Sequence, residues 1–320
     1  MTRVLTILLV GFMMGQALIS RAQEQTLIPD DRLVIEGFEI RGNKVTREAI
    51  ILRELLFGTG DTILKMDLIP AFQRSKENLL NTSLFNFVYF DANHLPGNRI
   101  IVEITVTERW YIWPVPILEY AERNFSEFIT NREWDKIVYG AWLKWNNFRG
   151  RKELLTGKIR LGYINEYALA YNVPNLGKRQ QHGITSGFNV NHQNEVNVNT
   201  INNAPVDYKP TEKPAQIRIN AFGKYSFRRK LYSTHTLRMD YFHYTVSDSV
   251  PVVNPNYLGD ERTTLGFFML SYEFRHDVRN SKIYPLEGFA VKIMAEKLGL
   301  GIIPEFPYPT VRLTGVLMYH

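Results

Sequence analysis

Three polar side chains near residue 235 have the types that nucleophilic catalysis requires. Ser233, His235 and Asp240 could supply a hydroxyl, a base and an orienting carboxylate, as a phospholipase would need. The chain has no Gly-x-Ser-x-Gly, no glycine-rich phosphate loop and no His-Glu-x-x-His. Its seven histidines are scattered and it has no cysteine, which excludes thiol chemistry and cysteine-ligated zinc. We therefore interpret these side chains as lone polar residues on the water-facing side of strands, and expect no enzyme, no metal and no cofactor.

The composition excludes further classes of protein. The chain carries 38 Lys and Arg against 32 Asp and Glu, a net charge of +6, and no basic run stands out, so nucleic acid is not an expected partner. With 45% hydrophobic and 22% charged residues, the chain is expected to fold. Aromatic residues reach 13%, an excess that the fold has to explain.

The N-terminus has the pattern of a secretory signal peptide over residues 1–22. Arg3 precedes a mostly apolar stretch, and Ser20 and Ala22 are the small residues of a cleavage site after Ala22. The alternative is an anchoring helix, but Gly15 and Gln16 interrupt a stretch that is already short for a span. No later stretch could form a transmembrane helix, so any entry into a bilayer would have to use strands.

Residues 33–108 predict a small α+β domain. Apolar residues recur at helical spacing in two segments, the first with Thr46 at its N-cap position and the second with Pro70 in its early turns. The expected order is strand, helix, helix, strand, strand, over residues 33–41, 46–58, 65–83, 85–90 and 99–107. The turn between the last two strands is expected at residues 93–98.

Several motifs in this segment carry a resemblance to a known domain. They are Gly37-Phe38, Gly42-Asn43, Gly60-Asp61-Thr62-Ile63, the run LLNTSLFNFV over residues 79–88 and Val106-Thr107-Glu108-Arg109. In this order they resemble a POTRA domain, the periplasmic module of outer-membrane barrels in the BamA/TamA superfamily. The resemblance implies that one strand lies at the sheet edge and receives an extended client; its residues would be Phe87, Val88, Tyr89, Phe90 and Asp91.

From residue 109 onward the sequence alternates with a period of two. Leu237, Met239 and Tyr241 alternate with Arg238 and Asp240, and similar segments of about 9 to 13 residues recur about ten times. In a soluble sandwich the apolar rows would meet a second sheet, and charges within the strands would be costly. In a transmembrane barrel the apolar rows meet lipid, the charges line a wet interior, and aromatic residues form interfacial girdles. The charges and the aromatic excess favour the barrel.

Three hairpin motifs extend the resemblance into this region. They lie at residues 146–153, 171–176 and 272–289, and the last contains Asp-x-Arg-Asn and Pro-x-x-Gly. The resemblance assigns a barrel family motif to Asp277, Arg279, Asn280, Pro285 and Gly288. The chain lacks the Arg-Gly-Phe loop and the aromatic-ended last strand of the superfamily. We therefore expect residues 109–320 to be the N-terminal part of an incomplete barrel, from a truncated reading frame or a fragment.

The fold implied by the resemblance is an α+β POTRA domain at residues 33–108 followed by an incomplete antiparallel transmembrane β-barrel. The implied location is the outer membrane of a Gram-negative cell, with the POTRA domain in the periplasm. The implied function is assembly or insertion of outer-membrane proteins by β-augmentation. Its partners would be unfolded outer-membrane clients, lipid, and accessory lipoproteins or periplasmic chaperones. A two-partner-type exporter and a structural barrel remain alternatives.

The first barrel strand is expected at residues 113–120, where it would meet the last strand at a lateral seam. Pro114 and Pro116 cannot donate ladder hydrogen bonds, so pairing there would be weak. The same two prolines could equally mark a linker into the barrel.

Overall fold

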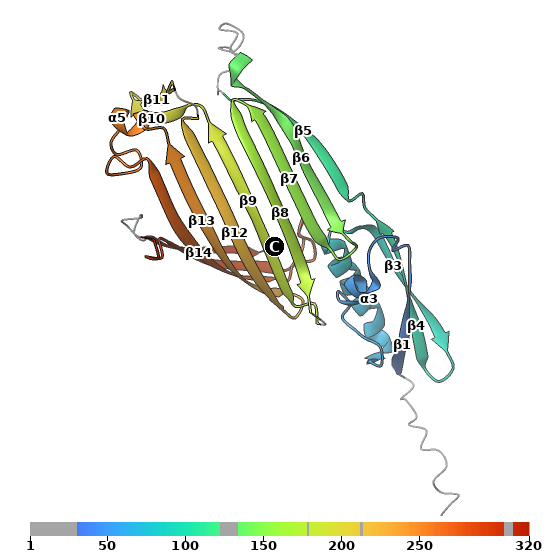
Figure 1. The fold of residues 1–320 in the computed structure, drawn as a ribbon. Helices are drawn as coiled ribbons and strands as arrows, with labels where there is room; N and C mark the ends of the chain where they lie inside the picture. The colour runs from blue at the N-terminus through green and yellow to red at the C-terminus, as the bar shows by residue number, and fades with distance from the viewer. Residues whose placement is uncertain (1–30, 122–133, 178, 212–213, 304–309, 320) are drawn as a thin grey trace, which may run out of the picture.

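The computed structural model describes residues 31–121, 134–177, 179–211, 214–303 and 310–319. The expected signal peptide at residues 1–22 lies outside these ranges. Two parts follow one another along the chain, a small α+β unit and a long, strongly curved sheet (Figure 1). Among the described residues, no helix combines the length and apolar character needed to cross a bilayer.

The small unit has a four-stranded mixed sheet in the order β2-β1-β4-β3. β1 pairs with β2 in antiparallel and with β4 in parallel orientation, and β3 pairs with β4 in antiparallel orientation. Its elements in chain order are β1 (Arg32–Arg41), α2 (Glu48–Leu52), β2 (Thr62–Leu64), α3 (Lys65–Asn81), β3 (Phe85–Leu95) and β4 (Arg99–Glu108). Both helices contribute to one hydrophobic core, with Ile51 and Leu79 fully buried against Ile35, Phe85 and Ile104 of the strands.

The structure corrects several expected boundaries in this unit. The helix expected over residues 46–58 is only α2, and β2 is a strand that the periodicity did not indicate. Thr46 does not cap α2, because the residue that precedes the helix is Arg47 and no side chain caps it. β3 continues to Leu95, so the turn expected at residues 93–98 is shorter. Helix α3 ends at Asn81 and accommodates Pro70.

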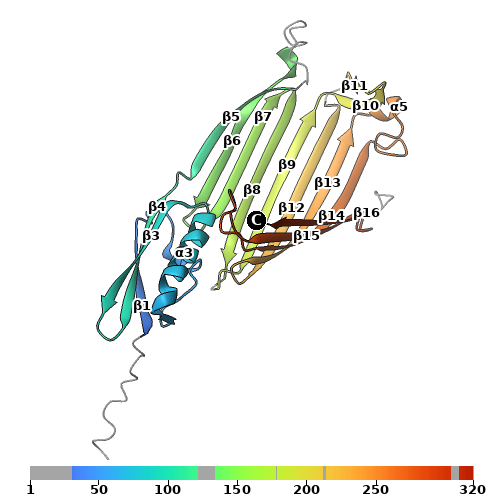
Figure 2. The same ribbon diagram turned by 180° about the vertical axis from the view of Figure 1, so that it is seen from behind.

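The large sheet has ten strands, and every neighbouring pair is antiparallel. The order is β16-β15-β14-β13-β12-β9-β8-β7-β6-β5. The strands are β5 (Ile112–Tyr120), β6 (Ile137–Phe148), β7 (Glu153–Gly162), β8 (Ile164–Leu176), β9 (His182–Gln193), β12 (Gln216–Arg229), β13 (Ser233–Val246), β14 (Thr264–Asp277), β15 (Phe289–Leu298) and β16 (Thr310–Tyr319). Figure 2 shows the same sheet from behind, with its twist carrying β15 and β16 across the direction of β5 to β9.

The edge strands of this sheet can be compared with the expected seam and with the two possible roles of Pro114 and Pro116. Within the described residues β5 pairs only with β6 and β16 only with β15, so these strands form its edges. Pro114 and Pro116 lie within β5 opposite Leu143 and Ala141 of β6, so they belong to the sheet rather than to a linker. An edge strand tolerates proline because one side of its backbone has no ladder partner.

A small cap lies at the end of the sheet far from the α+β unit (Figure 1). It contains the hairpin β10 (Val196–Ile201) with β11 (Ala204–Tyr208) and the short helix α5 (Ser249–Val253). Val196, Val198 and Val250 are buried together there. A single 3-10 turn, η1 (Trp134–Lys136), precedes β6.

Candidate functional site

The outer face of the large sheet carries exposed apolar rows. On β13, Leu237 is 47% and Met239 39% exposed, and their register partners Tyr272 and Leu270 of β14 lie on the same face. The same face of β16 carries Leu313 at 77% exposure. These rows are therefore open to the surroundings in the described structure and are not covered by a second sheet. Exposed rows of this kind suit contact with lipid.

The opposite, inner face carries the charged side chains as ion pairs between strands. Glu166 of β8 lies 2.5 Å from Arg160 and 3.0 Å from Lys158, both on β7. Arg160 also reaches Glu119 of β5 at 3.1 Å. Farther along the sheet, Asp240 is fully buried and accepts hydrogen bonds from Arg238 and Asn220, while Lys292 lies 3.1 Å from Glu273. Paired charges on one face and apolar rows on the other give the sheet two distinct environments.

Strand β3 forms the outer edge of the four-stranded sheet, because it pairs only with β4 among the described strands. All five predicted client-binding residues lie on it. Val88 is fully buried, whereas Phe87 is 58% and Tyr89 59% exposed. Phe90 stacks on Phe72 of helix α3, with 5.1 Å between ring centroids. The strand thus presents an unpaired backbone edge and two exposed aromatic side chains.

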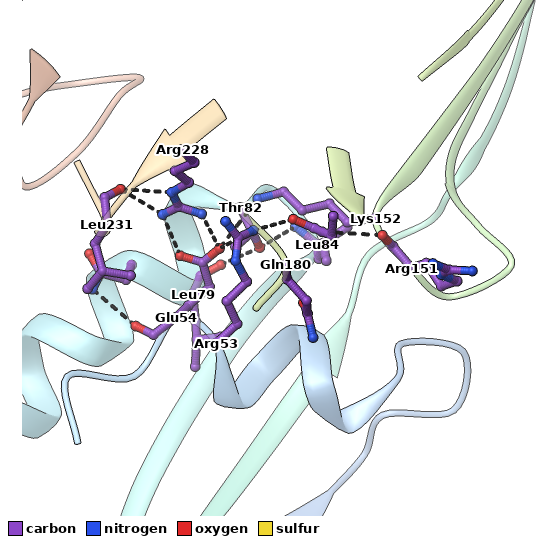
Figure 3. A network of polar contacts seen from close by, with 12 residues as sticks. Arg53, Glu54, Leu79, Thr82, Leu84, Arg151, Lys152, Gln180, Arg228 and Leu231 are labelled. Carbon is purple, nitrogen blue, oxygen red and sulfur yellow. Dashed lines mark hydrogen bonds and ion pairs between the residues drawn. The ribbon is translucent and has the colours of Figure 1, made fainter. Parts of the chain in front are cut away.

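The small unit contacts the sheet through a buried ion cluster centred on Glu54 (Figure 3). Both carboxylate oxygens of Glu54 accept hydrogen bonds from Arg228 of β12, at 2.8 and 2.9 Å. The Lys152 ammonium lies 3.8 Å from the same carboxylate, as does the guanidinium of Arg53. Arg53 donates a hydrogen bond to Asn175 of β8. One carboxylate therefore joins the segment after α2 to a strand and a turn of the large sheet.

The charges of this cluster shift one another's protonation. Burial alone would raise the pKa of Glu54, but Lys152, Arg228 and Arg53 together lower it to about 2. Burial lowers the pKa of Lys152 to about 8, and the neighbouring Arg228 and Lys282 act in the same direction. Glu54 is therefore ionised at neutral pH and holds several cations together.

A second contact joins the β6–β7 turn to the start of α2. Asn147 is buried and donates a hydrogen bond to the hydroxyl of Thr46 at 2.8 Å, and that hydroxyl lies 3.1 Å from Tyr111. The amide of Arg47 donates to the carbonyl of Gly150 at 2.9 Å. Gly150 has φ +70°, and a Cβ there would lie 2.0 Å from the carbonyl oxygen of Val45. Only glycine fits this turn, because the two backbones touch.

The predicted barrel motif forms the loop between β14 and β15. Arg279 donates two hydrogen bonds of 2.8 Å to the carboxylate of Asp277. The side chain of Asn280 accepts from the amides of Ser281 and Leu286, which holds the loop around Pro285 closed. Gly288 has φ +96°, and a Cβ there would lie 2.6 Å from the carbonyl oxygen of Val278.

This loop also contacts the small unit. The side chain of Asn81, the last residue of α3, donates to the carbonyl of Asn280 at 3.0 Å and accepts from the amide of Lys282 at 3.1 Å. Arg74 of the same helix donates to the carbonyl of Val278 at 2.9 Å. Between helix α3, these turns and Glu54 lies a polar pocket of about 240 Å³, lined by Lys152, Arg228 and Lys282 among others.

The sequence did not indicate Glu54, Arg228, Lys152 or Asn81 as members of one site. Glu54 directly precedes Leu55 and Leu56 in an apolar segment, and this is the one signal that a buried charge was present. The three residues first considered for catalysis are separated. Ser233 and His235 lie on the outer face of β13 and not, as expected, on the charged inner face; Ser233 bonds to His276 and His235 to Tyr272. Asp240 does lie on the inner face, with Arg238.

No protein-family model matches the chain, and no curated protein matches it. Among solved structures it is similar to BamA from Haemophilus ducreyi lacking POTRA domains 1–3, with a TM-score of 0.49 and 15% identity over 84% of this chain and 49% of that chain. It is also similar to CdiB from Acinetobacter baumannii (TM-score 0.43, 11% identity, 89% of this chain and 46% of that chain). The third similar structure is CdiB from Escherichia coli, with a TM-score of 0.43 and 10% identity over 84% of this chain and 46% of that chain. The chain spans about half the length of each of these structures.

Proposed function

We propose that the chain is part of a BamA-like outer-membrane protein that assembles other outer-membrane proteins. Residues 33–108 would be its POTRA domain on the periplasmic side, and residues 109–320 would contribute strands to its transmembrane barrel. The two faces of the large sheet support the membrane part of this proposal, because the apolar rows are exposed and the charges pair on the inner face. Such a division suits strands between lipid and a wet interior.

The observation that carries the assembly function is the open edge of β3. An unfolded outer-membrane strand has unpaired N–H and C=O groups, which are costly to bring into lipid. A sheet edge can pair with such a strand by β-augmentation, while side-chain contacts add affinity. β3 offers this edge together with the exposed rings of Phe87 and Tyr89. Because the small unit is fixed to the turns of the large sheet, a strand bound at β3 would be held close to the membrane part.

Replacing Tyr89 by proline is expected to abolish crosslinking of unfolded outer-membrane proteins to β3. Proline removes a backbone donor and bends the edge, so an added strand loses its register. The measurement is photo-crosslinking from position 91 to a radiolabelled client in a periplasmic extract. A second variant, Phe87→Ser with Tyr89→Ser, keeps the backbone and is expected to reduce crosslinking several-fold through lost side-chain contacts.

The matched control is Asn93→Ser, an exposed substitution on the same strand beyond the predicted client-binding residues. Far-UV circular dichroism of each variant checks that the sheet is retained. Crosslinking that persists in both β3 variants would exclude this edge as the client site. Crosslinks confined to one secreted polypeptide, with porins absent, would instead support the exporter alternative.

A further inference from the structure

Five of the six histidines in the described part of the chain lie on the outer face of the large sheet, at the two ends of its apolar rows. His182 of β9, His235 of β13 and His276 of β14 lie at the end next to the small unit. His192 of β9 and His243 of β13 lie at the other end. The sixth, His94, lies on β3 of the small unit.

The spacing between the two groups matches the apolar thickness of a membrane. His182 and His192 are ten residues apart on β9, and the outer-face residues between them are Ile184, Ser186, Phe188 and Val190. Ten residues of a strand span about 34 Å, or about 25 Å along the membrane normal at the tilt of barrel strands. His182 and His192 would therefore lie at the level of lipid headgroups if the rows face lipid, as the proposed function requires. His235 and His243 are eight residues apart on β13, so they span about 27 Å along the strand and would lie slightly deeper.

The three histidines near the small unit share one bonding pattern. The Nδ1 atom of His182 lies 2.6 Å from the Tyr225 hydroxyl, and that of His235 lies 2.8 Å from the Tyr272 hydroxyl. The Nδ1 atom of His276 lies 2.8 Å from the hydroxyl of Ser233. Each partner is on a neighbouring strand, and within the described residues the Nε2 atoms of all three rings make no hydrogen bond. The pattern fixes each ring and leaves one nitrogen for an external ligand.

Aromatic rings link these histidines across the strands. Phe227 of β12 lies between His182 and His235, with ring centroids 5.3 and 6.4 Å away. Phe274 lies 5.1 Å from His235, and Phe289 lies 5.8 Å from His276. Such rings are typical of the membrane interface, where one end of the side chain is apolar and the other is wet.

No carboxylate in the described structure forms an ion pair with the three histidines, so a positive charge on their rings would not be neutralised. The titratable groups in contact are Tyr225 and Tyr272, and no ion pair with a carboxylate is formed by the three rings in the described structure. Asp277, the acidic neighbour of His276 along β14, pairs with Arg279 on the other side of the strand. The exposed charged residues of the adjoining turns are the four cations Arg179, Arg229, Lys230 and Lys282 and one carboxylate, Glu287, so the turns carry a net positive charge. This end of the outer face therefore suits an anionic ligand.

We propose that His182, His235 and His276 form a histidine belt that binds the phosphate of phospholipid headgroups and binds it more strongly as the pH falls. Histidine is the side chain whose charge changes between about pH 5 and 8. A protonated ring can donate from Nε2 to a phosphate oxygen while Nδ1 donates to the neighbouring hydroxyl. The proposal rests on the membrane placement of the sheet but does not depend on client binding at β3.

The test measures how much phosphatidylglycerol the full chain retains in detergent micelles, by native mass spectrometry at pH 5.5 and pH 7.5. The wild type is expected to retain about tenfold more at the lower pH, since protonated rings add positive charge at the level of the anionic headgroups. The variant His182→Asn/His235→Asn/His276→Asn is expected to lose this pH dependence, and each single substitution to lose part of it. His94→Asn is the matched control and is expected to behave as the wild type. Heat-modifiability on a gel checks that each variant keeps its sheet.

Four outcomes would overturn the belt. Phospholipid retained equally at both pH values would refute it while leaving the membrane placement intact. A pH dependence that survives in the triple variant would assign it to other groups, and displacement of the lipid by millimolar inorganic phosphate would show a free-anion site. A chain that retains no phospholipid at either pH would overturn both the belt and the membrane placement.

Discussion

Replacing Met239 by arginine is expected to remove most of the folded, membrane-inserted protein. Met239 lies in the middle of β13 on the outer face, where it is 39% exposed. A charged side chain facing the bilayer midplane costs about 2–4 kcal/mol, which lowers the ratio of folded to unfolded protein at a given urea concentration by about 30- to 1000-fold. The measurement is urea-dependent folding into vesicles, followed by the heat-modifiable gel band.

A nearby inner-face residue of the same strand provides the matched control. Thr236 lies on the inner face opposite Glu273 of β14, so Thr236→Arg places the same charge beside a carboxylate. This variant is expected to fold within about 1 kcal/mol of the wild type, because lumen-facing substitutions are tolerated. Equal destabilisation by the two substitutions would mean that both faces of β13 lie in similar surroundings.

Replacing Glu54 by glutamine is expected to release the small unit from the large sheet. The substitution leaves Arg228, Lys152 and Arg53 close together without their shared carboxylate. Breaking a buried ion cluster by removing one partner costs about 3–5 kcal/mol. Hydrogen exchange of residues 43–58 is therefore expected to accelerate about 100-fold or more. Glu48→Gln is the control, since Glu48 is exposed at the start of α2; unchanged exchange in Glu54→Gln would mean that the cluster does not hold the unit.

The same cluster sets a pH dependence with a defined sign. The pKa of Glu54 is about 2 in the folded protein and about 4.3 in an unfolded chain, so the carboxylate stabilises the folded form. Because the folded pKa is depressed, the stabilisation is complete above about pH 4.3 and is lost as the pH falls toward 2. The contact between the two parts is therefore expected to be insensitive to pH between 5 and 7, which separates it from the histidine belt.

The sequence could predict the large sheet because alternation in each strand reports the two environments on its own. The odd positions from Leu237 to Tyr241 and from Val311 to Leu317 were assigned to one face by period alone, and the structure places them so. The edge position of β3 came only from a resemblance, because no local pattern reveals which strand lacks a neighbour. The sequence predicts a longer helix than α2, because the apolar residues that follow Leu52 suggest that the helix continues. Leu55 and Phe57 are buried, but the backbone that carries them is irregular.

The junction between the two parts could not be predicted from the sequence. Glu54 and Arg228 are 174 residues apart, and their pairing depends on the curvature of the sheet and on where the β12–β13 turn ends. Asn147 and Gly150 belong to a turn motif that the sequence shows, but nothing in the sequence marks Thr46 and Val45 as their partners. Long-range polar contacts of this kind carry no periodicity, so only the fold brings them together.

The most direct test of the central claim is the accessibility of single spin labels along β13 in lipid vesicles. The chain has no native cysteine, so a single cysteine introduced at each position from 234 to 241 would carry the only spin label. Labels at 237, 239 and 241 are expected to collide mainly with oxygen dissolved in the lipid, and labels at 234, 236 and 238 mainly with a water-soluble nickel chelate. The claim would be contradicted if labels at the odd positions were poorly accessible to both reagents and the accessibility did not alternate along the strand. The apolar rows would then be covered by protein.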